Sequence, residues 1–249
     1  METMINSFFD VAIEQLRTIE KFEKENIHAA AEAVAKSVLE KDVFYTFGSG
    51  HSIFIAKDAY WRAGGLAPAV NIPEPLGGDA ERLPGFAAVL AAHYELRPGS
   101  TIIVISNSGI NALPLELAMD CKERGLTVVA ITNRTHSASV PARHASGKKL
   151  MDIADVVVDT HGVPGDASLT LPGTDLHVGA TSTILGSAIM MAIISEAALI
   201  IKQKGIEPPV IVSANMPEGD AWNKKLADRY RSVIIRYEIS TVDAGKKAK

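Results

Sequence analysis

The sequence predicts an α/β fold in which a parallel sheet is flanked by helices, with a helical extension at its N-terminal side. Two observations carry this prediction. Short apolar runs of strand length alternate with segments of helix length, and the runs are continuously apolar, as in strands covered on both faces. The runs are VFYTF (43–47), TIIVIS (101–106), TVVAIT (127–132) and DVVVDT (155–160).

The elements around these runs follow from local patterns. Residues 1–41 predict one or two amphipathic helices, because apolar residues such as Ile5, Phe9 and Ile13 recur three or four positions apart. The stretch LAPAVNIPEP (66–75) is compatible with a further strand that its prolines end. Helices are predicted at 52–63, 86–94 and 111–125, the last closed by Gly125.

The second half of the chain contains a polar stretch and then an apolar one. Residues 161–177, rich in Gly, Pro and Asp, predict a long irregular loop. Residues 178–201 carry one ionisable group, Glu196, which raises the option of a membrane span. No basic loop or aromatic belt flanks this segment, so we expect a buried central helix. The helix could be buried within one chain or against a second subunit. A short extended piece, a charged helix and a solvated tail follow.

Composition excludes several classes of protein. The 249 residues are 47% hydrophobic, enough for one large domain with a substantial core. Lys and Arg number 25 against 29 Asp and Glu, so no broad cationic field is available for nucleic acid. Cys121 is the only cysteine, which excludes an intramolecular disulfide and fits a reducing, cytoplasmic location for an inert core thiol. The N-terminus shows no export signal.

Two Gly/Ser loops carry the functional prediction. GSGHS (48–52) follows the first apolar run and SNSGIN (106–111) follows the second. The carboxyl ends of neighbouring parallel strands face one crevice, and helices that begin there present free N–H groups to an anion. Both loops contain neutral donors and no Lys or Arg, which favours a small phosphate group. The alternative is that the Ser and Asn residues of these turns only cap the helices that follow.

Two nucleotide-binding motifs are excluded by the same residues. A dinucleotide fingerprint G-x-G-x-x-G needs a third glycine, and after Gly48 and Gly50 the position is Ile53. A P-loop needs Gly-Lys followed by Ser or Thr, which neither loop contains. A phosphate group on a small molecule is therefore favoured over a nucleotide.

The two loops, together with GATST (179–183) before the long apolar helix, resemble the sugar isomerase (SIS) domain family. The resemblance covers about residues 30–205 and implies a three-layer sandwich, flavodoxin-like or Rossmann-like, that binds phosphosugars. The chain looks most similar to SIS proteins that stand alone, related to phosphoheptose isomerase and N-acetylmuramic acid 6-phosphate etherase. Carried over position by position, the resemblance implies that substrate and phosphate are bound by Gly50, Ser52, Ser106, Asn107, Ser108, Gly109, Asn111, Ser182 and Thr183.

The chain departs from the family where protons are moved. His177 stands where two other family members, the isomerase domain of glucosamine-6-phosphate synthase and the etherase, have a Glu, five residues before Ser182. The Glu and metal-binding His of the heptose isomerase are unmatched, since the corresponding helix offers Asp58 and Arg62. Histidine titrates near neutral pH and suits proton transfer through an enediol. The candidate catalytic residues are His177, Glu74 and His51; no metal and no cofactor are expected.

Three further polar residues lie outside the loops, in the segment before the long apolar helix or within that helix. His161 and Asp166 could reach the sugar or a partner subunit, although helix capping explains Asp166 equally well. Glu196 lies 14 residues past Ser182, about 21 Å along a helix, beyond direct reach of a sugar held at the start of that helix. We expect Glu196 to pair with a Lys or Arg at a helix or subunit contact.

Together these observations predict three parts: N-terminal helices (1–41) that pack on the domain or across a dimer, a phosphosugar-binding domain (42–213), and a C-terminal helix with a solvated tail (214–249). The first choice of function is aldose–ketose isomerisation of a sugar phosphate through an enediol. A phosphosugar lyase or etherase remains open, as does a non-catalytic sensor that acts through a protein partner. A homodimer or homotetramer is expected, with no nucleic-acid or membrane partner.

Overall fold

The computed structural model describes residues 3–233, and its centre is a five-stranded sheet with the order β2-β1-β3-β4-β5. Every neighbouring pair is parallel, as the alternation of apolar runs predicts. The strand predicted within 66–75 is present as an edge strand. The bounds are β1 (Phe44–Gly48), β2 (Ala69–Ile72), β3 (Thr101–Ile105), β4 (Thr127–Thr132) and β5 (Val156–Asp159).

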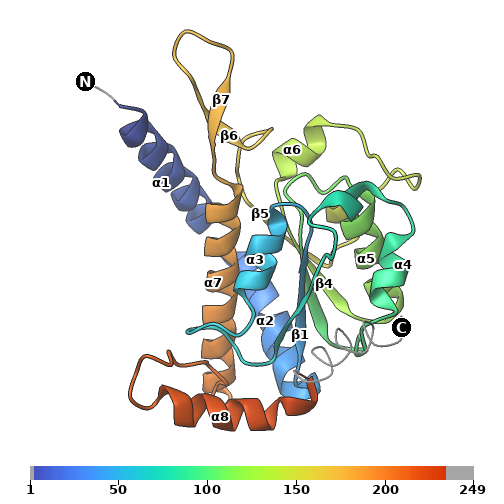
Figure 1. Cartoon of the computed structure of the whole chain (residues 1–249), viewed down its shortest axis with the longest axis vertical. Helices are drawn as coiled ribbons and strands as arrows, with labels where there is room; N and C mark the ends of the chain where they lie inside the picture. The colour runs from blue at the N-terminus through green and yellow to red at the C-terminus, as the bar shows by residue number, and fades with distance from the viewer. Residues whose placement is uncertain (1–2, 234–249) are drawn as a thin grey trace, which may run out of the picture.

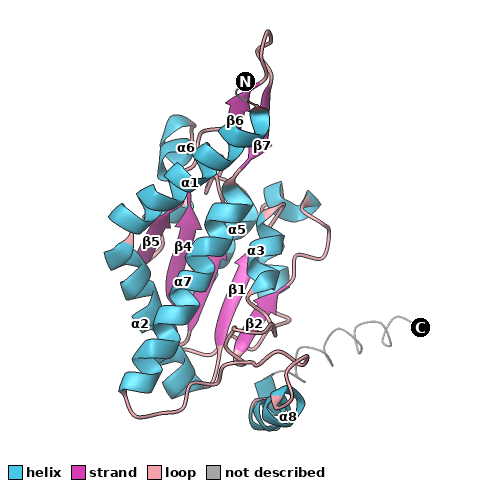
Figure 2. Ribbon diagram, turned by 90° about the vertical axis from the view of Figure 1, so that its left-hand side faces the viewer, coloured by secondary structure: helices cyan, strands magenta, loops and turns pink. Residues whose placement is uncertain are grey.

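Helices cover both faces of the sheet, which makes a three-layer sandwich (Figures 1 and 2). Successive residues of a strand point to opposite faces, so Ile103 and Ile105 join one core while Ile102 and Val104 join the other. The first core is covered by α2 (Lys24–Lys41), α3 (Ser52–Asp58) and α7 (Ser182–Gln203), with α1 (Met4–Phe22) against α7. The second is covered by α4 (Phe86–Ala91) and α5 (Ala112–Glu123).

The long apolar helix α7 belongs to the first core. By length and composition it is the one helix in the described part of the chain that could cross a membrane. Its buried residues, among them Ile189, Ile193 and Ala197, pack in the same cluster as Val34 of α2 and Val158 of β5. Burial against the domain accounts for the apolar composition, as we expected for a central core helix.

The prediction of an irregular loop at 161–177 is wrong. β6 (Ala167–Thr170) and β7 (His177–Ala180) form an antiparallel hairpin that projects from the domain beside α1 (Figure 1). The dipeptide Pro172-Gly173 lies in the connection, and Gly173 has φ +77°. Pro-Gly between two short β-compatible runs is a turn signal. The strands are only four residues long, and this masked the alternation in the sequence.

Other elements differ in extent. The helix predicted at 52–63 ends at Asp58, and Trp61 has φ +46°. The sequence analysis missed the helix α6 (Arg134–Ser139) and the short 3₁₀ turns η1 (Asp79–Arg82) and η2 (Leu150–Asp152). The charged C-terminal helix is present as α8 (Gly219–Arg229), while the predicted tail lies outside the described residues.

Candidate functional site

The two Gly/Ser loops lie side by side at the carboxyl end of the sheet. Gly48, the last residue of β1, pairs with Ile105, the last residue of β3, so Ser49 and Ser106 begin adjacent loops. The chain leaves β1 toward β2 on one side and returns to β3 on the other, which makes the β1–β3 border the topological switch point. Ligands of open α/β sheets bind in the crevice at this point.

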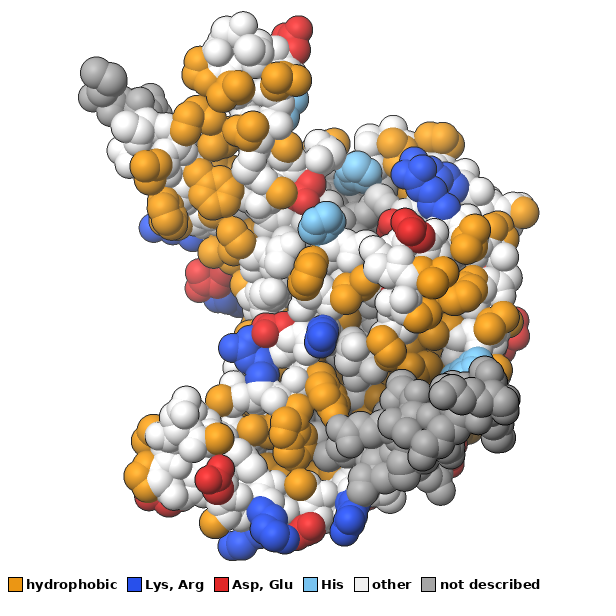
Figure 3. Space-filling view, in the orientation of Figure 1, with side chains coloured by type: hydrophobic (Ala, Val, Ile, Leu, Met, Phe, Trp, Pro, Cys, Tyr) orange, Lys and Arg blue, Asp and Glu red, His pale blue; other side chains and the backbone are white. Residues whose placement is uncertain are grey.

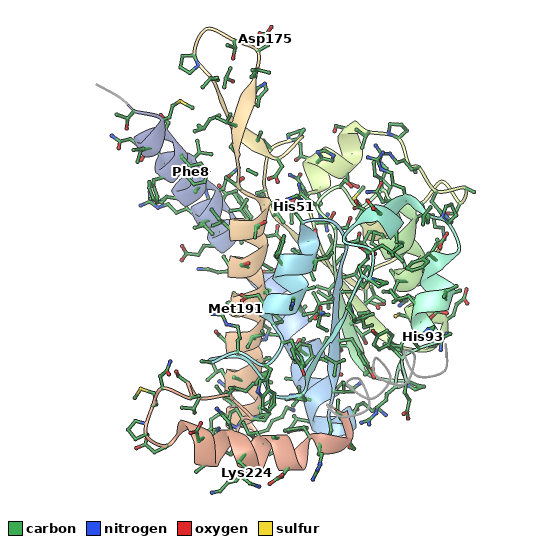
Figure 4. All side chains as sticks on the ribbon, viewed as in Figure 1. Phe8, His51, His93, Asp175, Met191 and Lys224 are labelled. Carbon is green, nitrogen blue, oxygen red and sulfur yellow. The ribbon has the colours of Figure 1, made fainter. Side chains whose placement is uncertain are left out.

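The first loop turns directly from β1 into α3. A Cβ on Gly48 would lie 2.3 Å from the carbonyl oxygen of Ser52, so only glycine allows this close approach. Gly50 has φ +58°, in the left-handed region that glycine adopts without strain. The side chain of Ser52 is nearly buried at the start of α3, whereas His51, labelled in Figure 4, is exposed just before that helix.

An acidic residue that the sequence analysis missed lies against the first loop. A Cβ on Gly50 would be 3.3 Å from Oε2 of Glu81, in η1. The backbone of the preceding turn is equally close, since a Cβ on Gly78 would be 3.0 Å from Cα of Gly50. The Glu81 carboxylate therefore lies at the switch point, partly exposed, beside a loop that contains no charge of its own.

The contacts of Glu74 explain how this turn is held. Its buried carboxylate accepts hydrogen bonds from the backbone N–H of Leu76, at 2.8 Å, and of Gly78. Both oxygens are thus engaged with the turn that precedes Glu81. A role for Glu74 in proton transfer stays a prediction, and its contacts give it a structural role in positioning Glu81.

The second loop is folded around its own first serine. Ser106 is buried, and its hydroxyl accepts a hydrogen bond from the N–H of Gly109 at 3.2 Å. Gly109 has φ +64°, and a Cβ there would be 2.9 Å from Oγ1 of Thr132 at the end of β4. Asn107 and Ser108 between them are partly exposed, and Asn111 is buried immediately before α5.

A cation from a distant part of the chain reaches this loop. Nη1 of Arg143 donates to Oδ1 of Asn111 at 2.8 Å. This contact uses the acceptor of the amide and leaves its Nδ2 group as the donor that a bound anion requires. Asn111 and Arg143 also line a cavity of about 300 Å³, together with Arg82, Pro84, Ala112, His144 and Ala145.

Buried polar atoms without a partner gather at the same end of the sheet. Of the seven such atoms in the described chain, five belong to residues that follow four neighbouring strands of the sheet, β1, β3, β4 and β5, or lie in α6. Buried polar groups are normally hydrogen-bonded, so these atoms are available to a ligand or to water. They are Ser49 Oγ, Asn107 Oδ1, Asn133 Nδ2, Ser137 Oγ and Thr160 Oγ1.

The start of α7 completes this end of the molecule. A Cβ on Gly186 would be 2.5 Å from Cδ1 of Ile55, so α7 packs closely on α3 one turn after Ser182. The carboxylate of Asp166 accepts from the N–H of Thr181 and of Ser182, and from the Ser182 hydroxyl at 2.6 Å. Asp166 therefore caps α7, and its charge disfavours a phosphate there; Ser182 and the exposed Thr183 suit a sugar hydroxyl better.

His177 is not brought to the loops within one chain. It is the exposed first residue of β7, about 10 Å along the strand from Ala180, in a hairpin that projects beyond the sheet (Figure 1). Its nearest polar partner shown is Thr170, whose hydroxyl oxygen lies 3.4 Å from Nδ1. A catalytic role for His177 stays a prediction, and it would require a second subunit or movement of the hairpin.

His161 and Glu196 are held by partners that the sequence did not indicate. Nε2 of His161 lies 2.9 Å from Oε1 of Glu23, a buried residue between α1 and α2. The backbone N–H of His161 donates to Oδ1 of Asp159 at 3.0 Å. Glu196 pairs with His28 at 2.8 Å; the expectation of a Lys or Arg partner is wrong. Both contacts join the N-terminal helices to the domain.

The geometry contains no obvious metal centre. Among residues 3–233, no three side chains of His, Cys, Asp or Glu gather as a possible ligand set. Cys121 is buried in α5, and burial raises the pKa of its thiol to about 12, with the charge of Asp120 acting in the same direction. The thiol is therefore neutral at physiological pH and has no thiolate to offer to a metal or a substrate.

Comparison with known proteins agrees with this arrangement. The model of the SIS domain matches residues 7–133, which include both loops. The chain belongs to the SIS domain family. It is 36% identical to a UPF0309 protein of Geobacillus thermodenitrificans over 240 residues, which cover 93% of this chain and 96% of the relative. A UPF0309 protein of Streptomyces coelicolor is 37% identical, with 92% and 95% covered.

Solved SIS structures share the fold at low sequence identity. A phosphoheptose isomerase from Neisseria gonorrhoeae superposes with a TM-score of 0.56 at 19% identity, over 78% of this chain and 97% of that one. The Vibrio vulnificus NanR protein, solved in complex with ManNAc-6P, gives 0.53 at 15% identity, over 94% and 70%. The same fold thus occurs both in a phosphoheptose isomerase and in a protein that was solved with a bound sugar phosphate, ManNAc-6P.

The residues that sequence reasoning missed lie outside the loop motifs. Glu81 and Arg82 belong to GGDAER, and Arg143 to PARHAS, both in connections between elements. Nothing in their local pattern separates them from solvated loop charges. The sequence offered one signal for them, which is their position. Each is a charged residue in a connection at the carboxyl edge of the predicted parallel sheet.

Proposed function

We propose that this SIS-domain protein binds a sugar phosphate at the β1–β3 switch point and interconverts its aldose and ketose forms through an enediol. The proposal rests on one observation: two loops with different charged neighbours lie side by side at one crevice. The second loop offers neutral donors and the nearby Arg143, and the first loop lies against the carboxylate of Glu81. A phosphate group and a proton-transfer group would thus be held at opposite ends of one small sugar.

In this proposal the phosphate lies in the second loop, on Ser106, Ser108, Gly109 and the amide of Asn111. Ser52 and Gly50 would hold the sugar near the first loop, and Ser182 and Thr183 would bind its hydroxyls. The support is the burial of Ser106 and Asn111 together with the partnerless Asn107 Oδ1 and Ser49 Oγ at the same edge. Such atoms gain hydrogen bonds when a polar ligand enters.

Glu81 is our choice for the base. It would remove the proton from C2 of the aldose to give the enediol and return a proton to C1, which leaves the ketose. His51, exposed in the first loop, would move a proton between the two oxygens. Proton transfer by a positioned side chain typically contributes a factor of about 10² to 10⁴ to the rate.

The direct test uses the purified protein in D₂O with a panel of hexose, amino-sugar and heptose phosphates, followed by NMR. Deuterium at C2 together with a new ketose signal is the expected result. Loss of a C3 substituent would replace the isomerase with a lyase or etherase, which begins with the same proton abstraction. Saturable binding without exchange would replace both with a phosphosugar sensor, and no binding of any sugar phosphate would overturn the whole proposal.

We also propose that the protein is a homodimer whose contact includes α1 and the β6–β7 hairpin. The support is exposed apolar surface on both: Ile5 is 68% exposed, Phe9 60% and Leu176 63%. The hairpin packs on α1 within one chain, since a Cβ on Gly179 would be 3.0 Å from the ring of Phe8. Light scattering should give twice the chain mass, and Phe9→Ser with Leu176→Ser should give the mass of one chain.

A further inference from the structure

The cavity beside the second loop is lined by cationic side chains. Of the residues that form its wall, Arg82 comes from η1, Arg143 and His144 from the connection after α6, and Asn111 and Ala112 from the start of α5. These segments are far apart in the sequence and meet only in the folded chain. Figure 3 shows one patch of Lys and Arg side chains on the upper right of this face, next to an acidic side chain.

Within residues 3–233, only one of the three basic side chains of this cavity lies beside a carboxylate. Nε2 of His144 lies 3.2 Å from Oε1 of Glu116, whose other oxygen accepts from the N–H of Gly85 at 2.8 Å. Arg143 is engaged with a neutral amide oxygen on Asn111. Arg82 makes no ion pair with any residue in the 3–233 range. Arg82 and Arg143 thus line one cavity, and neither has a carboxylate partner within residues 3–233.

Asn111 connects the cavity to the phosphate loop. Its backbone ends the second loop, its buried side chain gives its oxygen to Arg143, and it lines the cavity. A ligand group in the loop and a ligand group in the cavity would therefore be separated by one side chain. The planar fork of a guanidinium matches a carboxylate or a phosphate with two parallel hydrogen bonds.

We propose that Arg82 and Arg143 bind a second anionic group of the substrate, so that the protein acts on sugar phosphates that carry a further carboxylate or phosphate. This inference rests on the proposed function and narrows its substrate class. The cavity volume of about 300 Å³ leaves room for such a group. Arg143 would have two roles, because it also orients Asn111. Arg82 would only bind the second anionic group.

The test measures the affinity of the wild-type protein for two matched pairs of ligands by calorimetry. Glucose 6-phosphate is compared with 6-phosphogluconate, in which C1 is oxidised to a carboxylate, and fructose 6-phosphate with fructose 1,6-bisphosphate, which adds a phosphate. We expect the member with two anionic groups to bind about tenfold more tightly or better in at least one pair. The pair that shows the preference distinguishes a carboxylate from a phosphate.

The decisive variant is Arg82→Gln, which keeps the length of the side chain and removes the charge. It should abolish the preference while leaving the affinity for the singly phosphorylated member within about twofold. The matched control is Arg229→Gln, in α8 at the opposite end of the molecule (Figure 1), which should keep the preference. Wild-type-like melting temperatures verify that both variants fold.

Three results would overturn the inference. Equal affinities within both pairs would exclude a second anionic site, as would a preference that survives Arg82→Gln. Equal weakening of both members by Arg82→Gln would show that the arginines hold the same phosphate as the loop. Binding of no sugar phosphate at all is a different outcome, because it would remove the proposed function together with this inference.

Discussion

The two Gly/Ser loops look alike in the sequence and differ in the folded protein. Each follows a buried strand, begins a helix and contains only neutral donors. In the structure, the first loop lies against the carboxylate of Glu81, whereas the second receives Arg143 and lies beside the cavity that Arg82 lines. The difference teaches that distant connections supply the electrostatic character of each loop, since a carboxylate lies beside the first and a guanidinium beside the second.

The helices that follow the loops differ as well. α3 has 7 residues, of which three are buried, and it leaves Phe54 exposed. α5 has 12 residues with seven buried, including Leu113, Leu117 and Cys121. Burial of apolar surface stabilises α5 more than α3, at roughly 25 cal/mol per Å². The second loop is therefore built on the firmer element.

The largest expected effect comes from Glu81→Gln, which removes the charge from the first loop. Deuterium exchange at C2 should fall about 10²-fold or more, because the general base is lost, while the affinity for the sugar phosphate stays within a few-fold. Asp79→Asn, an exposed acid in the same 3₁₀ turn, is the control and should keep wild-type exchange. Undiminished exchange in Glu81→Gln would remove the functional distinction between the loops.

Gly48→Ala tests the tight turn of the first loop. The new methyl group would meet the carbonyl oxygen of Ser52 at 2.3 Å, so backbone must move, at a cost of about 1–3 kcal/mol in the free energy of unfolding. Chemical denaturation measures this cost. Gly77→Ala is the comparison: it has φ +63° and open space, so it reports backbone strain alone. A cost at Gly48 no larger than at Gly77 would contradict the close approach.

Ser108→Ala tests the second loop without touching its fold. Ser108 is partly exposed, whereas the hydroxyl of Ser106 supports the loop through Gly109. Loss of one hydrogen bond to a charged phosphate should weaken binding about tenfold, with little change in melting temperature. Ser139→Ala, in an exposed position of α6, is the control. Binding that is equally strong in Ser108→Ala would place the phosphate elsewhere.

The smallest effect is expected from the thiol of α5. Because the pKa of Cys121 is about 12 and its side chain is buried, a thiol reagent at pH 8 should react only when α5 opens. The reaction should be slow in the native protein, unchanged by sugar phosphate or slower with it, and complete in denaturant. Fast native labelling would show that the helix behind the second loop is less firm than its packing implies.

Much of the fold could be predicted because its elements are locally encoded. The apolar runs that became β1, β3, β4 and β5 are buried on both faces. Strands of that kind can be identified from the sequence without knowledge of the strands beside them. The hairpin of β6 and β7 was missed because its strands are short and partly exposed, and it depends on α1 through Phe8. Patterns of four residues are too short to distinguish a strand from a loop.

The sequence by itself determined the parallel sheet, the two Gly/Ser loops at strand ends and the membership of the SIS family, since these follow from hydrophobic runs and from glycines at strand ends. Only the tertiary structure decided which charges reach the loops. Glu81 meets Gly50 and Arg143 meets Asn111 across 31 and 32 positions of the chain. Electrostatic interaction depends on distance in space, and a sequence records distance only along the chain.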